Sequence, residues 1–507
     1  MRILRIALLL LMVSALPCNA AYQTMEITNI KASGTGSPAI PSTARIFKAY
    51  PGIEYNIRPA VLGGDYPYTY ELTTYPTGMT INARTGEISW PNPTTTGSPH
   101  SCAIRVTDSS ATQVTASWSV TVSTSGFKFV NSSAGTNGDG SISSPYNSIN
   151  NMLAGASRHD IIYFRSGTHG VTANYGWLNE NDDPYMWLGY PGETATIDMN
   201  DYPVATADPV YFDDLTFTDM DYYGLVIYGG TSYHTIRRCI FDGFTNTISD
   251  HENQGVIYIT GSEGAGFYSA IQDNEIKNWS SAAGTASGIG SVYRCQKLLI
   301  ENNYIHSTAT DSIMGILLKI NTYTTTVRGN KIILADGWPI YFDAYSNQDG
   351  YEICYNLLVN TSGRGDTGVY NAFNWYQGLT WEYRNTIITD LIVRTCNYAA
   401  GITIANNIIS NPNTAWGDFA SISNYVSYND ASSCFTTSNN LTSTTASTLV
   451  DSADEYKLVS GQAAYIGSRG WQLSDGLTPM ELGDADPTPT PGPATVSGVT
   501  MSGCSVR

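Results

Sequence analysis

The sequence predicts an all-β protein in which most of the chain forms a parallel β-helix and the first part forms a small β-sandwich. An asparagine marker recurs every 22 to 33 residues without helical periodicity. Short alternating strands with turns precede that region, and 47 glycines and 35 tyrosines accompany only 13% charged residues. A repeat of this length indicates a solenoid, and the composition suits β-architecture rather than coiled coil or disorder.

The repeating marker is an aliphatic residue, two variable positions, asparagine, one variable position and another aliphatic residue. Five asparagines match it fully, one matches its second half and one ends the series weakly: Asn274, Asn303, Asn330, Asn356 and Asn407, then Asn385, then Asn440. Coils of a parallel β-helix stack about 4.8 Å apart. An asparagine at one corner can therefore donate its amide to one neighbour and accept from the other. We interpret the series as structural.

Both ends of the chain differ from its middle. Residues 1–20 have the form of a signal peptide, because Arg2 and Arg5 precede an apolar run that ends in small residues. No later run is long and apolar enough to span a bilayer, so we expect a secreted or cell-surface protein. Residues 476–507 are expected to form a Pro/Thr-rich linker and a short tail.

The charge balance narrows the choice of partner. The chain carries a net charge of −18, and 23 basic residues face 43 acidic ones once the two arginines of the leader are removed. Nucleic acid is disfavoured, because duplex binding depends on phosphate neutralisation by lysine and arginine. An acidic polysaccharide would need a local basic patch or a bridging cation. The sequence does not indicate the oligomeric state.

Seven cysteines remain after export, and an odd number excludes complete pairing within the chain. Their spacing matches no zinc pattern. Cys239 takes the place of a marker asparagine, and Cys354 lies two residues before Asn356. We therefore expect small buried core residues rather than a disulfide framework.

Residues 21–126 have short alternating strands separated by turns every eight to twelve positions, the pattern of an immunoglobulin-like sandwich. The motif PTGMTINARTGEISW resembles the Ig/cadherin-like repeat of bacterial secreted proteins. The resemblance implies that Thr85 and Gly86 form a hairpin before a core tryptophan, Trp90. It also implies a spacer or a binding module, and of these a spacer is favoured.

Residues 127–475 begin with a Gly-Asp-Gly loop and a strand, IIYFRSGTH. Between them, Ser144 can cap and Pro145 can begin a short helix that covers the open end of the solenoid. These features, and the closing AAYIGSRGW, are similar to the pectate-lyase-like right-handed parallel β-helix superfamily. That superfamily includes lyases, hydrolases, epimerases and phage or surface proteins, so the resemblance implies a fold but no single chemistry.

Candidate functional residues follow from the alternation along a strand. If the strand after each opening glycine forms a groove, Ile316, Leu318 and Ile340 face the bore. The outward polar residues then form a column across four coils: Arg294, Lys319, Asp343 and Asn374. Aromatic residues flank this column: Tyr323, Tyr341, Tyr345, Tyr370 and Trp375. A register slip of one residue would invert these assignments.

This column suits a lyase that cleaves an acidic polysaccharide by β-elimination. Aromatic rings can stack on sugars. Arg294 could neutralise the sugar carboxylate, and Lys319 could remove the adjacent proton if its surroundings favour the uncharged amine. Asp343 completes the polar set. Lysine and arginine hold such roles in the lyases that the chain resembles.

Two other enzymatic features remain open. A glycoside hydrolase needs two carboxyl groups roughly 5 to 9.5 Å apart, and Asp343 has candidate partners in Asp349, Asp366 and Glu382. A calcium site is conceivable in YFDDLTFTDMD, since carboxylates are hard oxygen ligands. Its candidate ligands are Asp213, Asp214, Asp219 and Asp221.

The alternative to an enzyme is a noncatalytic glycan-binding or adhesin-like surface protein. It would use the same aromatic side to hold a glycan. The acidic excess and the lack of a clear catalytic motif favour this reading.

Overall fold

The computed structural model describes most of the chain from residue 23 to residue 482. The described residues are 23–35, 39–157, 159–172, 185–202, 204–206, 209–221, 224–228, 232–246, 254–260, 268–282, 286–293, 295–310, 313–319, 324–344, 350–361, 368–373, 380–388, 390–396, 402–410, 435–443 and 445–482. The leader predicted at residues 1–20 and most of the tail lie outside them.

The first domain is an Ig-like β-sandwich of short strands. One sheet has the order β2 (Lys48–Ala49), β9 (Gln113–Val122), β8 (His100–Thr107) and β5 (Thr69–Thr74). The other has the order β3 (Tyr55–Ile57), β7 (Ile88–Trp90) and β6 (Thr80–Ile81), and β1 (Glu26–Ile27) pairs with β4 (Val61–Leu62). Tyr55, Trp90 and Trp118 fill the space between them.

The expected hairpin before Trp90 is present between β6 and β7. Gly86 has a φ of +78°, and its amide donates to the carbonyl of Asn82 at 2.9 Å. A Cβ at this position would lie 2.7 Å from the ring of Tyr70, so both the backbone conformation and the packing require glycine. Trp90 is buried and donates its Nε1 to the carbonyl of Thr77. The expectation from the motif is confirmed.

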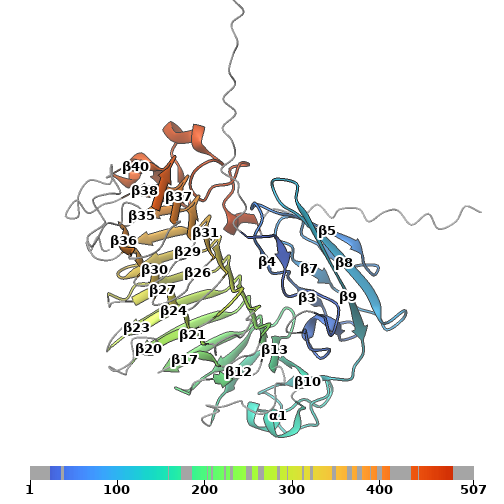
Figure 1. The fold of residues 1–507 in the computed structure, drawn as a ribbon. Helices are drawn as coiled ribbons and strands as arrows, with labels where there is room; N and C mark the ends of the chain where they lie inside the picture. Colours follow the sequence, from blue (N-terminus) through green and yellow to red (C-terminus); the bar gives the residue numbers. More distant parts are fainter. Residues whose placement is uncertain are drawn as a thin grey trace, which may run out of the picture.

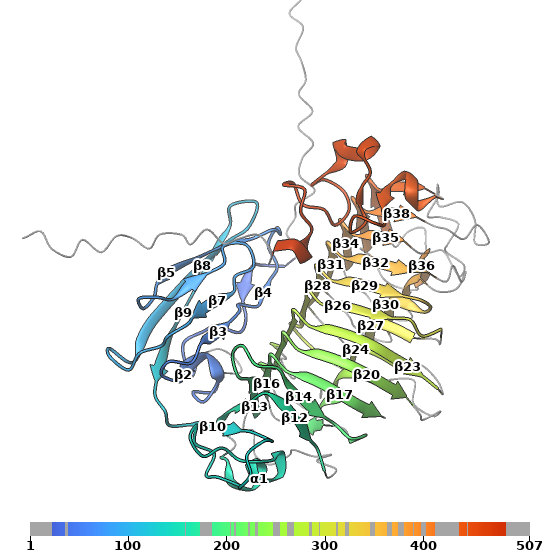
Figure 2. The same ribbon diagram turned by 180° about the vertical axis from the view of Figure 1, so that it is seen from behind.

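The second domain is a right-handed parallel β-helix of three sheets, named sheets A, B and C (Figures 1 and 2). Within the described residues, sheet A has twelve strands: β10 (Phe127–Val130), β11 (Ile161–Phe164), β13 (Tyr185–Gly189), β16 (Val210–Asp213), β19 (Thr235–Arg237), β22 (Ala270–Gln272), β25 (Leu299–Glu301), β28 (Thr325–Arg328), β31 (Tyr351–Cys354), β34 (Thr380–Tyr383), β37 (Ile402–Ala405) and β39 (Phe435–Ser438).

Sheets B and C complete each coil. The described strands of sheet B are β12 (Gly167–Gly170), β14 (Ala195–Asp198), β17 (Thr216–Asp221), β20 (Ile240–Asn246), β23 (Glu275–Ser281), β26 (Tyr304–Ser307), β29 (Lys331–Leu334), β32 (Leu357–Asn360), β35 (Thr386–Ile388), β38 (Ile408–Ser410) and β40 (Leu441–Ser443). Those of sheet C are β15 (Val204–Thr206), β18 (Leu225–Tyr228), β21 (Gln254–Thr260), β24 (Ala286–Tyr293), β27 (Ile313–Lys319), β30 (Trp338–Ala344), β33 (Gly368–Phe373) and β36 (Asp390–Cys396).

The asparagine ladder lies at the corner between sheets A and B. The Nδ2 of Asn303 donates to the Oδ1 of Asn330 at 2.9 Å, and the Nδ2 of Asn330 donates to the Oδ1 of Asn356 at 3.0 Å. The same contact links every consecutive pair from Asn274 to Asn440. The structural interpretation is confirmed, and Asn385 and Asn440 are full members despite their weaker match to the marker.

The bore is filled by aliphatic and aromatic side chains from all three sheets, which form one continuous cluster. Ile316, Leu318 and Ile340 belong to it and have no exposed surface. The expected register of the sheet C strands therefore holds at these positions.

The open end of the bore is covered by α1 (Ile149–Gly155), whose Ile149 and Met152 pack onto the core. The expected start at Ser144 and Pro145 is wrong. Tyr146 instead donates its amide to the carbonyl of Phe129 and forms a parallel bridge with Val130. This pairing keeps the chain extended, and the helix starts later, with Ser148 as its N-cap.

The chain after sheet B folds back as a compact segment, residues 445–482, which contains η5 (Ala446–Thr448), β41 (Val450–Asp451), β42 (Lys457–Leu458), η6 (Ser460–Tyr465) and η7 (Pro479–Leu482). Its Trp471 is fully buried against Leu357, Val359 and Ile408 of sheet B. Leu358 and Ile409 face the bore, so Trp471 lies on the outer face of sheet B and covers its last coils.

Four of the cysteines are buried and form no disulfide, as expected: Cys102, Cys239, Cys295 and Cys354. The backbone amide of Cys239 donates to the Oδ1 of Asn274 at 3.0 Å, which places this residue at the end of the asparagine ladder. Among the described residues, none forms a helix with the length and hydropathy needed to cross a membrane.

Candidate functional site

The outer face of sheet A is occupied by the Ig-like domain, which lies alongside the solenoid on the side of β16, β28 and β31 (Figure 2). The last residues of successive strands form a polar column on this face: Asp213, Arg237, Gln272, Glu301 and Arg328. All of these side chains are buried. A buried polar column needs partners, and the Ig-like domain supplies several of them.

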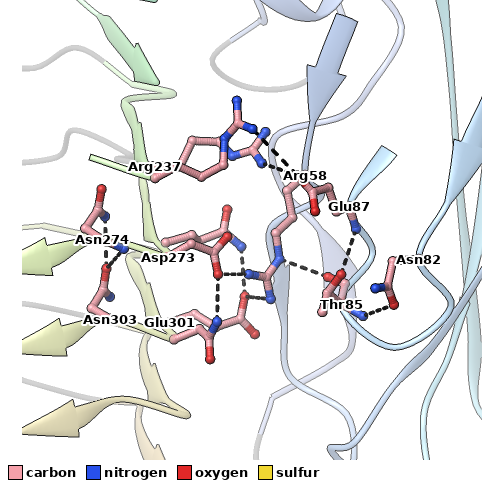
Figure 3. Close-up of polar contacts among 12 residues, drawn as sticks. Arg58, Asn82, Thr85, Glu87, Arg237, Asp273, Asn274, Glu301 and Asn303 are labelled. Atoms are coloured by element: carbon pink, nitrogen blue, oxygen red, sulfur yellow. Dashed lines mark hydrogen bonds and ion pairs between the residues drawn. The ribbon is translucent and has the colours of Figure 1, made fainter. Parts of the chain in front are cut away.

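Arg58 of the Ig-like domain reaches across the interface (Figure 3). Its guanidinium pairs with Asp273 and lies 3.1 Å from an oxygen of Glu301, while its Nε donates to the carbonyl of Thr85 at 2.9 Å. Burial alone would raise the pKa of Asp273, but the charge of Arg58 outweighs it and holds that pKa below its usual value. The guanidinium of Arg58 is therefore held by residues of both domains.

Arg328 is held by both domains. Its guanidinium donates to Glu301 at 2.6 and 2.9 Å, to the hydroxyl of Tyr68 at 2.8 Å and to the carbonyl of Val61 at 3.1 Å. Burial opposes ionisation of Glu301, yet Arg328 and Arg58 together keep its pKa below the usual value. The ion pairs are buried and satisfied, which favours one fixed orientation of the two domains.

Contacts continue along sheet A. At its first strand, the ring of Tyr50 packs edge-on against Phe127 at 5.5 Å. Beside β31, the ring of Tyr66 packs against that of Tyr355 at 5.0 Å, and Arg84 pairs with Asp475 of residues 445–482. The Ig-like domain is thus docked along the solenoid, and the favoured reading of a simple spacer does not describe it.

The outer faces of sheets B and C lie away from the Ig-like domain (Figure 2). The middle coils of sheet B present a network of charges on strands β23 and β26: Glu275 accepts from Lys277 at 3.3 Å and from the Nε2 of His306 at 3.0 Å. This pattern is typical of a solvated face. The outer face of sheet C differs, because it carries apolar and aromatic side chains.

Leu317 of sheet C lies between the bore residues Ile316 and Leu318, so its side chain points outward. The residues in register with Leu317 on the neighbouring strands form a line across six coils. This line is here called the sheet C ladder and consists of Val226, Tyr258, Gly290, Leu317, Tyr341 and Tyr370. Val226, Tyr258, Leu317 and Met314 are buried and pack together in a cluster separate from the bore, and the partly buried Trp338 and Tyr341 pack against it.

Lys319 lies at the end of β27, two residues beyond Leu317 and on the same face. Asp343 stands opposite it in the next coil, and Ala372 stands opposite Asp343 in the coil after that. Two predicted catalytic residues, Lys319 and Asp343, are therefore neighbours on adjacent strands. The ring of Trp338 lies 5.6 Å from that of Tyr341, two residues from Asp343.

Several predicted residues lie outside the described part of the chain: Arg294, Tyr323, Tyr345, Asn374 and Trp375. Tyr370 and Asp343 are described through their strands only. The four-residue polar column thus stays a prediction beyond the Lys319 and Asp343 positions.

Of the carboxylates predicted to pair with Asp343 in hydrolysis, the structure describes only one. Asp349 and Asp366 lie outside the described residues. Glu382 is on β34 of sheet A, in register with Ile353 and Ile404, which face the bore. It belongs to a different sheet from Asp343, and the pair stays a prediction.

The proposed calcium ligands are distributed over two sheets. Asp213 ends a strand of sheet A and accepts from the Nε of Arg238 at 2.7 Å. Burial raises the pKa of the nearby Asp214, with Arg238 opposing the shift. Asp219 and Asp221 belong to β17 of sheet B. In the described ranges, no three His, Cys, Asp or Glu side chains are placed to hold a metal ion, and calcium binding stays a prediction.

Sequence reasoning missed the charged residues of the domain interface. The signal was present in the marker itself, because Gln272, Glu301 and Arg328 each stand two places before a ladder asparagine. That variable position is the outward one of a buried strand. Large polar residues there, repeated over successive coils, indicate a face that another element covers.

The fold and its packing define a parallel β-helix protein with an Ig-like domain docked along one sheet. Residues 37–123 match a family model described as "Putative Ig domain". No curated protein matches the chain in sequence.

Two solved structures show a likeness in fold. One is titled rhamnogalacturonan lyase, with 11% identity and a TM-score of 0.34, covering 62% of this chain and 86% of that chain. The other is pectate lyase Pel9A, with 13% identity and a TM-score of 0.24, covering 63% of this chain and 78% of that chain.

Proposed function

We propose that the protein binds an acidic polysaccharide along the outer face of sheet C and cleaves it by β-elimination. The observation that carries this proposal is the sheet C ladder, an apolar and aromatic line that runs over successive coils beside Lys319 and Asp343. Rings and aliphatic side chains suit the faces of sugars, and a few charged groups fix their orientation. With the leader expected at residues 1–20, the substrate would be met outside the cytoplasm.

The roles follow from the chemistry of elimination. Lys319, as the uncharged amine, takes the proton from the carbon next to the sugar carboxylate. The electron pair forms a carbon–carbon double bond, the glycosidic bond at the β-carbon breaks, and its oxygen leaves with the second sugar chain and gains a proton. Arg294 or a bridging cation neutralises the sugar carboxylate. Asp343 stands opposite Lys319 to position its amine.

The test is a substrate panel. Purified wild-type protein is incubated with pectate, alginate and glycosaminoglycans, with and without calcium, while the absorbance of the unsaturated product is followed. We expect product from at least one acidic polymer. Lys319→Ala should lower kcat at least about a hundredfold, as expected for loss of a general base, with a smaller change in KM.

Lys277→Ala is the matched control, because Lys277 is a lysine on the outer face of sheet B and not on sheet C. It should leave kcat unchanged. Absence of product from every polymer in both calcium conditions would remove the elimination proposal. Equal losses in the two variants would remove the role of Lys319.

The second candidate is a glycan-binding protein without catalysis. It is favoured by the net charge of −18 and by the strand register, which pairs the position of Lys319 with that of an acidic residue, Asp343. A glycan array distinguishes the two, because this candidate predicts saturable binding to a glycan that incubation leaves intact.

A further inference from the structure

A small polar cavity lies where the Ig-like domain meets the first coils of the solenoid, away from sheet C. Its volume is about 120 Å³. The Ig-like domain contributes Arg45 and Asn56 to its lining, and the solenoid contributes Tyr163, Gly189 and Asp213. A Cβ at Gly189 would lie 2.0 Å from the carbonyl oxygen of Asp214, so the close approach of these turns requires glycine at this wall.

Arg45 is the unusual residue of this cavity. It is only 2% exposed, and its Nε has no hydrogen-bond partner. One terminal nitrogen donates to the carbonyl of Lys48, and the guanidinium lies 4.7 Å from the centre of the Tyr55 ring. In the described chain, no carboxylate forms an ion pair with Arg45. A buried charge without a counter-charge is costly unless something in the cavity compensates it.

A second buried donor in this cavity also lacks a partner. The hydroxyl of Tyr163 lines the cavity, is buried and has no partner. By contrast, the negative charge of Asp213 is already compensated by Arg238 at 2.7 Å and Arg237 at 3.6 Å. Glu54 and Asp214 also line the cavity and are only partly buried. Glu54 accepts from the hydroxyl of Ser89 at 2.6 Å, and the charge of Arg238 acts on Asp214. The buried donors of Arg45 and Tyr163 therefore lack a negatively charged acceptor in the cavity.

We propose that this interdomain cavity binds a small oxyanion, with Arg45 as its charged partner and Tyr163 as a hydrogen-bond donor. A phosphate, a sulfate and the carboxylate of a sugar acid share the required chemistry, because each offers anionic oxygens to a guanidinium. The available volume corresponds to a few water molecules at roughly 30 Å³ each, which suits an ion of this size. Bound there, the ion would join the two domains.

The experiment is thermal unfolding of the full chain in chloride, phosphate, sulfate or acetate at matched ionic strength. Galacturonate, compared with neutral galactose, tests a sugar acid as the source of the carboxylate. We expect a saturable rise of the Tm with at least one oxyanion. Arg45→Gln should weaken the apparent affinity about tenfold or more, as expected from the loss of a charge-assisted hydrogen bond.

Two further variants make the result decisive. Tyr163→Phe removes only the hydroxyl and should also weaken the affinity, which keeps the test valid if Arg45→Gln does not fold. Arg105→Gln removes an exposed arginine of the same domain, which pairs with Glu71 outside the cavity, and should retain the full effect. An oxyanion effect that is absent, or equal in all four proteins, would show a cavity that holds water only and would overturn the proposal.

Discussion

At the scale of single residues, the corner between sheets A and B shows why one residue type recurs. The residue before each ladder asparagine adopts a left-handed conformation, as in Asp273 at φ +59° and Asn302 at φ +57°. This geometry turns the chain in two residues and directs the following side chain inward. Asparagine fits there because it carries both a donor and an acceptor, so each coil fixes the next.

Asn330 gives the test of this ladder. Its Oδ1 accepts from both the backbone amide and the Nδ2 of Asn303, each at 2.9 Å. Asn330→Ala leaves the buried backbone amide of Asn303 without an acceptor and leaves its Nδ2 with only the carbonyl of Ile271. We expect a loss of about 2–4 kcal/mol in the free energy of unfolding, measured by guanidinium denaturation. Asn150→Ala, at an exposed position of α1, should change it by less than about 0.5 kcal/mol. Equal effects would refute the structural role.

The ladder could be predicted from the sequence because its period and its chemistry both appear in the marker. The start of α1 could not, because Tyr146 pairs with Phe129 and Val130, and nothing local to Ser144 and Pro145 signals that pairing. A local propensity was overridden by a contact with a neighbouring strand.

At the scale of elements, the outer face of sheet A depends on the Ig-like domain. Arg328→Met would leave Glu301 buried with one of its two arginines missing. We expect a loss of about 3–5 kcal/mol in the free energy of unfolding. Arg328→Met combined with Glu301→Gln should recover part of this loss, because the uncompensated charge is removed. Arg105→Met, at an exposed pair, should cost less than about 0.5 kcal/mol. No recovery in the double variant would contradict the pairing.

The same contacts predict that the free energy of unfolding depends on pH. The pKa values of Asp273 and Glu301 lie below their usual values in the folded chain, because the arginine charges outweigh the effect of burial. The stabilisation is therefore fully present above their usual values of 3.8 and 4.5, and it is lost as the pH falls below them through the folded pKa values.

Urea denaturation of the wild type and of Glu301→Gln from neutral to acidic pH measures this dependence. The wild type should lose more stability than the variant as the pH falls below 4.5, the usual pKa of a glutamate. A stability difference between the two that does not vary with pH would argue against ionised Glu301 at the interface.

The docking of the Ig-like domain was beyond the reach of sequence patterns. Arg58 and Asp273 are separated by 215 residues, and Arg328 and Tyr68 by 260. Each domain was recognisable from its own periodicity, but a contact between them leaves no periodic trace. The polar residues at the outward positions of sheet A were the available signal, and it indicates a covered face without naming the element that covers it.

At the scale of the whole molecule, the three outer faces of the solenoid differ in what packs on them and in the residues they carry. The Ig-like domain covers sheet A, and residues 445–482 cover the last coils of sheet B. Sheet C carries the aromatic and apolar ladder beside Lys319 and Asp343. The strand register on this sheet was predictable from alternation, whereas the predicted Arg294 and Asn374 lie outside the described residues.

The most direct test of the sheet C proposal is the affinity for the acidic polysaccharide that gives product or array binding, measured by calorimetric titration. Tyr341→Ala should raise the Kd about tenfold or more, the effect of removing a central aromatic contact. Tyr304→Ala, on the outer face of sheet B beside His306, should leave the Kd unchanged. The reverse pattern, or an unchanged Kd in both variants, would contradict binding along sheet C.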